Sequence, residues 1–239
     1  MKIMIIEPVS TIEFRKEGEE YFRNLKEPST EISVRNLEAG PKTIETYLDI
    51  ALASPEIARL VYKEQENFDA FIIDCFADPG LEASREISRK LVLGVAEVTM
   101  HIASIIAHKF SVITTEKNSI PYTEIQALNY SLKDKLNKVV SVDIGVEGLI
   151  FSESNYRKFL KLAREEIRDG SEAIVLGCTK MNTFAERLQN DIKIPVLEPS
   201  RVTLRIAEAM VKIGINHSRF LKYAMTKSKL ESLNEDLKP

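Results

Sequence analysis

The 239-residue chain lacks most features that would assign it to a common function class. It has no tryptophan and only two cysteines, Cys75 and Cys178. Its net charge is −3 and no block of Lys or Arg stands out, so nucleic-acid binding is not expected. No apolar run reaches the roughly 20 residues of a membrane-spanning helix, and Glu7 interrupts the first run too early for a signal peptide. We therefore expect a cytoplasmic protein with reduced thiols and no membrane partner.

Two further absences narrow the chemistry. The chain has no glycine-rich phosphate loop, so a nucleotide site is not expected. Its cysteines and histidines are not spaced as metal ligands, so no metal site is expected either. Hydrophobic residues make up 44% and charged residues 29%, as in globular proteins. The length suffices for one large domain or for two small lobes, each with its own core.

The stretch around Cys75 is the most informative part of the chain. The short apolar run from Ala70 to Ile73 predicts a buried strand, which Cys75 closely follows. Asp78-Pro79 has the pattern of a helix N-cap followed by proline at the first helical position. The pattern therefore predicts that Cys75 lies in a strand-to-helix turn, near the positive end of a helix dipole. Such a position lowers the pKa of a thiol.

Cys178 lies in a copy of this stretch, because Glu172–Thr179 aligns with Asp69–Phe76 at an offset of 103 residues. Two other strand pairs repeat at offsets of 107 and 104. The predicted strands are residues 2–6, 31–37, 70–73 and 91–94, then 110–115, 138–143, the run before Cys178, and 195–198. The predicted helices are residues 12–25, 46–66 with a start or break at Ser54-Pro55, 79–90, 97–109, 151–169, a helix running through Leu188, and 199–213.

Strands that alternate with helices predict an α/β fold. We expect two pseudo-symmetric lobes, each a parallel sheet flanked by helices. The first would comprise residues 1–96 plus 200–215 and the second residues 97–199. Residues 216–239 would form a partly helical tail. Ligands bind beyond the carboxyl ends of parallel strands, and both cysteines follow such ends. The two thiols are therefore expected to face each other across a cleft between the lobes.

Two facing thiols suit the inversion of a carbon centre. A thiolate can remove a proton next to a carbonyl group, and a thiol on the opposite face can return one. The reverse reaction exchanges the two roles. A free thiol has a pKa of about 8.5, which is close enough to neutral for tuning. This scheme requires neither a metal nor a cofactor.

The motifs Cys75–Leu81 and Leu176–Met181 resemble the two cysteine motifs of the hydantoin racemase branch of the Asp/Glu/hydantoin racemase superfamily. The resemblance extends from the first strand to about residue 213 and includes the segments 40–45, 93–97 and 110–115. It implies a homo-oligomeric, cofactor-independent racemase of 5-substituted hydantoins with Cys75 and Cys178 as paired bases. Allantoin racemases and racemases of the Asp/Glu type are alternatives.

The first loop departs from the resemblance. The family usually has Asn-Pro-Asn-Ser-Thr where this chain has Glu7-Pro8-Val9-Ser10-Thr11. If Glu7 lies in the cleft, it would disfavour an anionic amino acid and tolerate a neutral or cationic substrate. The family's usual Asp is also replaced by Glu198.

The candidate substrate-binding residues lie at strand ends or adjoin the cysteines; they are Ser10, Thr11, Phe76, Thr114, Thr115 and Thr179. Hydroxyl groups at such positions also serve in turns and caps. The Thr179 N–H can hold an enolate oxygen or cap a helix. Asp78 is expected to cap a helix rather than act as an acid, and Lys180 either lowers the pKa of Cys178 or is solvated. A non-catalytic small-molecule binding protein with inert thiols is an alternative of another class.

Overall fold

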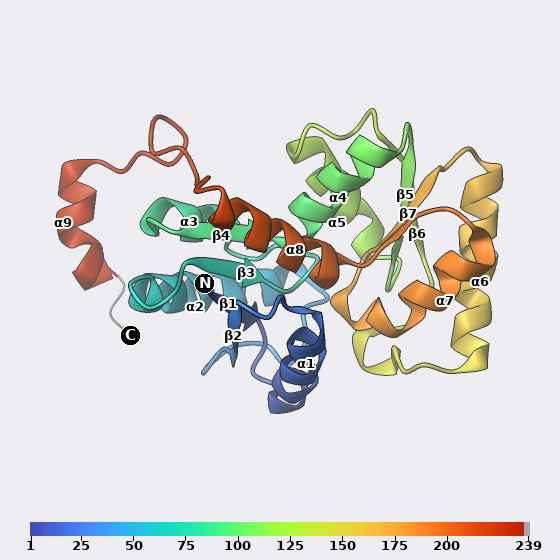
Figure 1. Ribbon diagram of the computed structural model, residues 1–239, viewed down its shortest axis with the longest axis horizontal. Coiled ribbons are helices and arrows are strands. Elements are labelled where there is room, and N and C mark those ends of the chain that lie inside the picture. The colour runs from blue at the N-terminus through green and yellow to red at the C-terminus, as the bar shows by residue number, and fades with distance from the viewer. Residues whose placement is uncertain (237–239) are drawn as a thin grey trace.

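The computed structural model describes residues 1–236, which form two α/β lobes side by side (Figure 1). The first lobe has a sheet of order β2-β1-β3-β4, with strands Lys2–Glu7 (β1), Glu31–Asn36 (β2), Ala70–Ile73 (β3) and Leu91–Gly94 (β4). The second has order β6-β5-β7-β8, with strands Phe110–Thr114 (β5), Leu136–Ser141 (β6), Ala173–Leu176 (β7) and Val196–Leu197 (β8). Every strand pairing in the described chain is parallel. The predicted two-lobed α/β fold is confirmed.

The helices alternate with these strands. They are Ile12–Leu25 (α1), Tyr47–Glu64 (α2), Leu81–Ile87 (α3), Val95–Ile106 (α4), Ser119–Asn129 (α5), Glu153–Arg168 (α6), Asn182–Ile192 (α7), Pro199–Lys212 (α8) and Lys227–Asp236 (α9), with short 3₁₀ turns at Val146–Gly148 (η1) and Thr179–Met181 (η2). Sequence analysis assigned no residue range to α5. The predicted helix 79–90 is shortened to α3.

The predicted break at Ser54-Pro55 is wrong, because Pro55 lies inside α2. Thr46 and Asp49 form a capping box that fixes the start of this helix eight residues earlier. Proline removes only one backbone N–H at position 55, and the face around buried Ile57 and Val61 packs on the core. Tertiary packing therefore carries the helix through the proline.

The central strands are apolar because both of their faces are buried. In β1, Ile3 and Ile5 contribute to one core cluster, whereas Met4 and Ile6 contribute to the cluster on the opposite face. All four side chains are fully buried. Burial of each such side chain contributes about 1.5–3 kcal/mol. A continuous apolar run is the pattern of a parallel strand covered by helices on both faces.

Two helices connect the lobes, because each follows a strand of one lobe and packs on the sheet of the other. Helix α4 follows β4 of the first lobe, yet Met100 and Ala103 share a core cluster with Phe110 of the second sheet. Helix α8 follows β8 of the second lobe, yet Leu204 and Ala207 pack in the core of the first sheet. These helices also contact each other, and α8 crosses the middle of the molecule (Figure 1). This exchange fixes the carboxyl ends of the two sheets relative to each other.

The segment after α8 covers the outer edge of the first sheet. The Val92 N–H donates to Nε2 of His217 over 3.0 Å, and Asn216 donates to the carbonyl of Arg89. The edge strand β4 is thereby shielded from pairing with another chain. The helix α9 follows at the end of the molecule opposite the second lobe (Figure 1), and the last three residues of the predicted tail lie outside the described residues. Across residues 1–236, no helix is long and apolar enough to cross a membrane.

Candidate active site

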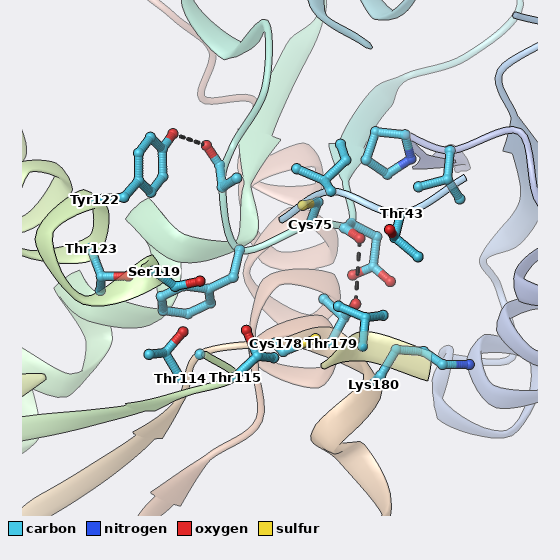
Figure 2. Close-up of a pocket in the computed structure, with 18 of the residues that line it drawn as sticks. Thr43, Cys75, Thr114, Thr115, Ser119, Tyr122, Thr123, Cys178, Thr179 and Lys180 are labelled. Carbon is cyan, nitrogen blue, oxygen red and sulfur yellow. Dashed lines mark hydrogen bonds between the residues drawn. The ribbon is translucent and has the colours of Figure 1, made fainter. Parts of the chain in front are cut away.

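A cavity opens between the lobes at the carboxyl ends of β1, β3, β5 and β7. Its empty volume, including the part open to solvent, is about 690 Å³. Six of the predicted site residues line it, namely Cys75, Phe76, Thr114, Thr115, Cys178 and Thr179. Other lining residues were not predicted from the sequence. Among them are Thr43, Ser119, Tyr122 and Thr123 (Figure 2), together with Asp74 and Gln126.

The two cysteines occupy equivalent positions in the two lobes. Each lies two residues beyond the last position at which its strand pairs with the central strand of its sheet, at Ile73 in β3 and Leu176 in β7. Figure 2 shows Cys75 on one side of the cavity and Cys178 on the other. Both thiols are free and partly exposed. The predicted internal repeat therefore delivers one thiol from each lobe to the same cavity.

Asp78 caps a helix, but not the one that sequence analysis predicted. Its carboxyl group accepts hydrogen bonds from the N–H groups of Ala96 (3.1 Å) and Glu97 (2.9 Å), in the first turn of α4. It also accepts a hydrogen bond from the hydroxyl of Tyr130. Helix α3 instead starts after Gly80, whose φ of 66° is left-handed and suits glycine. Asp78 thus connects the Cys75 loop to both α4 and α5.

The loop that carries Cys75 is held by α5 of the opposite lobe. Gln126 donates through Nε2 to the carbonyl of Phe76 over 3.0 Å, and the Tyr122 hydroxyl donates to the carbonyl of Ala77 over 2.6 Å. Nothing in the sequence pattern indicated either contact. They fix the position of the Cys75 loop relative to the second lobe.

The expected lowering of the thiol pKa is not observed. Burial raises the pKa of Cys75, and it raises that of Cys178 to about 12. The backbone N–H groups of Ala77 and Lys180 partly oppose this effect on the two pKa values. Helix α3 begins only at Leu81, so its first turn does not adjoin Cys75.

Glu7 and Asp74 line the cavity and have buried carboxyl groups, and the buried carboxyl group of Glu198 lies near that of Asp74. Asp74 accepts a hydrogen bond of 2.7 Å from the Ser200 hydroxyl, and Glu198 caps α8 by accepting from the backbone N–H of Ser200. Burial raises the pKa of all three carboxyl groups, that of Asp74 to about 7. Among residues 1–236, no group of three or more His, Cys, Asp or Glu side chains is arranged to hold a metal ion.

The raised pKa of Asp74 predicts a pH-dependent loss of stability. In the unfolded chain this carboxyl ionises near its ordinary pKa of about 3.9, whereas in the folded protein it ionises near 7. Below about pH 4 the carboxyl group is protonated in both states and does not lower the stability of the folded protein. As the pH rises to about 7, it ionises more readily in the unfolded chain, so the free energy of unfolding decreases. We expect Asp74→Asn to raise the free energy of unfolding by about 2–4 kcal/mol at pH 8 and to change it little at pH 4. Urea titrations of both proteins at the two pH values measure this, and an equal effect at both would contradict it.

Ser10 and Thr11 do not line the cavity. The Ser10 hydroxyl donates to the carbonyl of Gly40 over 3.2 Å, and the Thr11 hydroxyl donates to that of Lys42 over 2.8 Å. Both therefore hold the loop that precedes Thr43, which does line the cavity. The sequence left two roles open for these hydroxyl groups, substrate contact and a structural role in a turn. In the structure, both hydroxyl groups form the contacts of a turn.

Lys180 lies at the mouth of the cavity. Its ammonium group pairs with the carboxylate of Glu17 and lies 4.4 Å from the centre of the Phe14 ring, both on α1. Lys180 thus bridges from the second lobe to the first. A wider groove continues from the cavity between α1 and the segment 146–151, and both cavities share Glu7, Phe14, Asp74, Val146, Thr179 and Lys180.

Comparison with known proteins identifies the relatives of this fold and site. A family model described as Asp/Glu/Hydantoin racemase matches residues 3–207. A hydantoin racemase from Rhizobium meliloti is 33% identical over 235 residues, which cover 96% of each chain. Another from Pseudomonas sp. (strain NS671) is 31% identical over 235 residues, covering 96% of this chain and 93% of that one.

Solved structures agree in overall architecture. Allantoin racemase from Klebsiella pneumoniae superimposes with a TM-score of 0.88 at 28% identity, covering 95% of this chain and 94% of that chain. An arylmalonate decarboxylase is more distant, with a TM-score of 0.59 and 13% identity over 88% of this chain and 92% of that chain. The second likeness concerns the fold alone.

Proposed function

Because this chain belongs to the Asp/Glu/hydantoin racemase family and is a racemase, we propose that it interconverts the enantiomers of a 5-substituted hydantoin. One observation carries the proposal: the thiols of Cys75 and Cys178 come from equivalent positions of the two lobes and line one cavity. The full-length similarity to hydantoin racemases supports this choice of substrate. Family membership also favours an enzyme over the non-catalytic binding protein considered from the sequence.

The proposed reaction is a two-base proton transfer at C5 of the ring. One cysteine, as thiolate, removes the C5 proton, and the electron pair of the broken C–H bond moves toward the adjacent carbonyl to form an enolate. The other cysteine, as thiol, donates a proton to the opposite face of C5 and becomes the thiolate. The reaction is balanced without a cofactor, and the reverse direction exchanges the two roles.

The cavity supplies groups that can stabilise the enolate and hold the ring. The backbone N–H of Thr179 and the hydroxyls of Thr114 and Thr115 line the cavity and can donate to a developing oxyanion. Phe76 offers an apolar surface for the ring. These proposed contacts fit a planar ring with carbonyl groups at its edge.

Allantoin is a second candidate substrate, because an allantoin racemase shares this architecture at 28% identity over nearly the whole chain. Allantoin is itself a hydantoin with a urea group at C5, so the same proton transfer applies to it. A free amino acid of the Asp/Glu type fits less well, because its carboxylates need cationic partners. Among the described residues that line the cavity only Lys180 is basic, and it is already paired with Glu17.

We also propose that the protein acts in the cytoplasm as a homo-oligomer, without cofactor, nucleic-acid or membrane partner. The free thiols of both cysteines suit a reducing compartment. Ile105 and Ile106 of α4 are 76% and 51% exposed, which supports this helix as a subunit contact. The proposed lobe limits, residues 1–96 plus 200–215 and 97–199, place α4 and α8 with the sheets on which they pack.

Racemisation in D₂O tests the proposed function. One enantiomer of a 5-substituted hydantoin is incubated with the protein while optical rotation and deuterium at C5 are followed and spontaneous racemisation is subtracted. We expect enzyme-dependent loss of rotation accompanied by uptake of deuterium. Activity on allantoin alone would select the second candidate, and activity only on free amino acids would overturn the assignment to a hydantoin ring.

A further inference from the structure

Glu7 lines the cavity, and its buried carboxyl group has no partner among the described residues. Glu7 ends β1 and is only 9% exposed, and it lines the same cavity as the two cysteines. Within residues 1–236, no hydrogen bond or ion pair reaches its side chain, whereas the neighbouring Asp74 and Glu198 are both hydrogen-bonded. Leaving a buried polar group without a partner costs stability. The stability of the fold therefore does not explain why a glutamate occupies this position.

The packing of α1 makes room for this carboxyl group. Gly18 of α1 faces it so closely that a Cβ at this position would lie 2.7 Å from Oε1 of Glu7. Any larger residue would displace the carboxyl group or the helix. The glycine therefore leaves room for the carboxyl group beneath α1, and Glu7 lines both the cavity and the wider groove beside it.

The charges around Glu7 favour its neutral form. Burial and the neighbouring Asp74 raise the pKa of Glu7 well above its ordinary value, whereas Lys180 acts in the opposite direction. The ammonium group of Lys180 is already paired with Glu17 of α1. The other titratable groups on adjoining elements are Tyr21 of α1, Glu198 at the start of α8, and Cys178, whose own pKa Glu7 helps to raise.

A neutral carboxyl group presents a different pattern from a carboxylate. Its O–H donates and its C=O accepts, side by side, whereas a carboxylate only accepts. A hydantoin ring presents an N–H beside a C=O. The neutral carboxyl group and the ring can therefore form two parallel hydrogen bonds. A carboxylate has no donor, so one of its oxygens would face the ring carbonyl, which is also an acceptor.

We propose that Glu7, in its protonated form, recognises the substrate by pairing its O–H and C=O with a carbonyl and the adjacent N–H of the hydantoin ring. This inference rests on the proposed function and assigns the ring-binding contact to a residue where the usual family pattern has asparagine. An asparagine carboxamide also presents a donor beside an acceptor. The protonated acid thus supplies the same pair of groups.

Binding of unsubstituted hydantoin tests the proposal without depending on racemisation, because this ring is achiral. Isothermal titration calorimetry would compare wild type with Glu7→Gln and Glu7→Met between pH 5 and 9. Glutamine keeps a donor beside an acceptor and cannot ionise, whereas methionine of similar length has neither group. Thermal unfolding of each variant shows whether it is folded.

We expect Glu7→Gln to bind within about threefold of wild type at pH 5–6, and Glu7→Met to bind about 10- to 100-fold more weakly, for two lost hydrogen bonds. At higher pH, Glu7 ionises and the affinity of wild type for hydantoin should fall. Ionisation of the ring itself affects wild type and Glu7→Gln equally, so the affinity of wild type should fall more than that of Glu7→Gln. Equal affinity of wild type and the folded Glu7→Met, tenfold weaker binding by Glu7→Gln, or no binding by wild type would each overturn the proposal.

The two proposals fail in different ways. If hydantoin binds with the expected dependence on residue 7 but no substituted hydantoin is racemised, the ring-binding role of Glu7 stands and the proposed reaction fails. If substituted hydantoins are racemised but binding is insensitive to both substitutions, the reaction stands and the role of Glu7 is wrong.

Discussion

Replacing either Cys75 or Cys178 by serine is expected to lower racemisation of a 5-substituted hydantoin by about 10²–10⁴-fold. A serine hydroxyl is a much weaker acid than a thiol and cannot supply the proposed base, and a positioned general acid or base contributes a factor of this size. Optical rotation with each enantiomer, measured for wild type and both variants, gives the loss directly. The side chains are nearly the same size, so the cavity should keep its shape.

Deuterium exchange provides the internal control for this prediction. Each variant retains one thiol on one face of C5, so it should exchange the proton of only one enantiomer, and the two variants should prefer opposite enantiomers. Such a reciprocal pattern distinguishes loss of a base from general damage to the site. A variant that racemises at the wild-type rate, or two variants that exchange the same enantiomer, would contradict the two-base scheme.

Replacing Asp78 by alanine is expected to lower the free energy of unfolding by about 3 kcal/mol or more. The change leaves three donors without their acceptor: the N–H groups of Ala96 and Glu97 and the hydroxyl of Tyr130. Each buried donor that loses its partner costs about 1–3 kcal/mol. The backbone of Asp78 is also left-handed, with φ of 45°, a conformation that alanine tolerates less well than aspartate or asparagine. Urea denaturation monitored by circular dichroism measures the loss.

Asp78→Asn is the matched control, since asparagine retains an acceptor oxygen and the left-handed conformation. We expect it to cost about 1–2 kcal/mol, less than alanine, because one of the two accepting oxygens is kept while the N–H bound by the other loses its acceptor. Gly94→Ala tests the same contact from the other side, as a Cβ there would lie 2.4 Å from the carboxyl carbon of Asp78. Should alanine at position 78 prove no worse than asparagine, the capping role would be wrong.

Local sequence determined the architecture and the catalytic candidates. The apolar runs that become β3 and β7 each start after an acidic residue, and each is followed by a cysteine at the same spacing. Parallel strands bring their carboxyl ends to one edge of a sheet, so spacing along the chain placed each cysteine at the ligand-binding edge of its own lobe. The packing of α4 and α8 across the lobes brings the two edges to one cavity. Thr114, at the end of β5, and Thr179, beside Cys178, were found by the same reasoning.

Only the tertiary structure decided which hydrogen bonds hold these residues in place and how their pKa values are shifted. Asp78 caps α4 rather than its own helix, and Tyr122 and Gln126 reach the Cys75 loop from the other lobe. Such contacts join residues about 20 to 50 positions apart and leave no local pattern in the chain. The raised pKa of Cys178 likewise depends on burial by both lobes. Hydrophobic periodicity records which residues are buried in each element, but pairing between polar groups depends on how the lobes pack, which only the folded chain specifies.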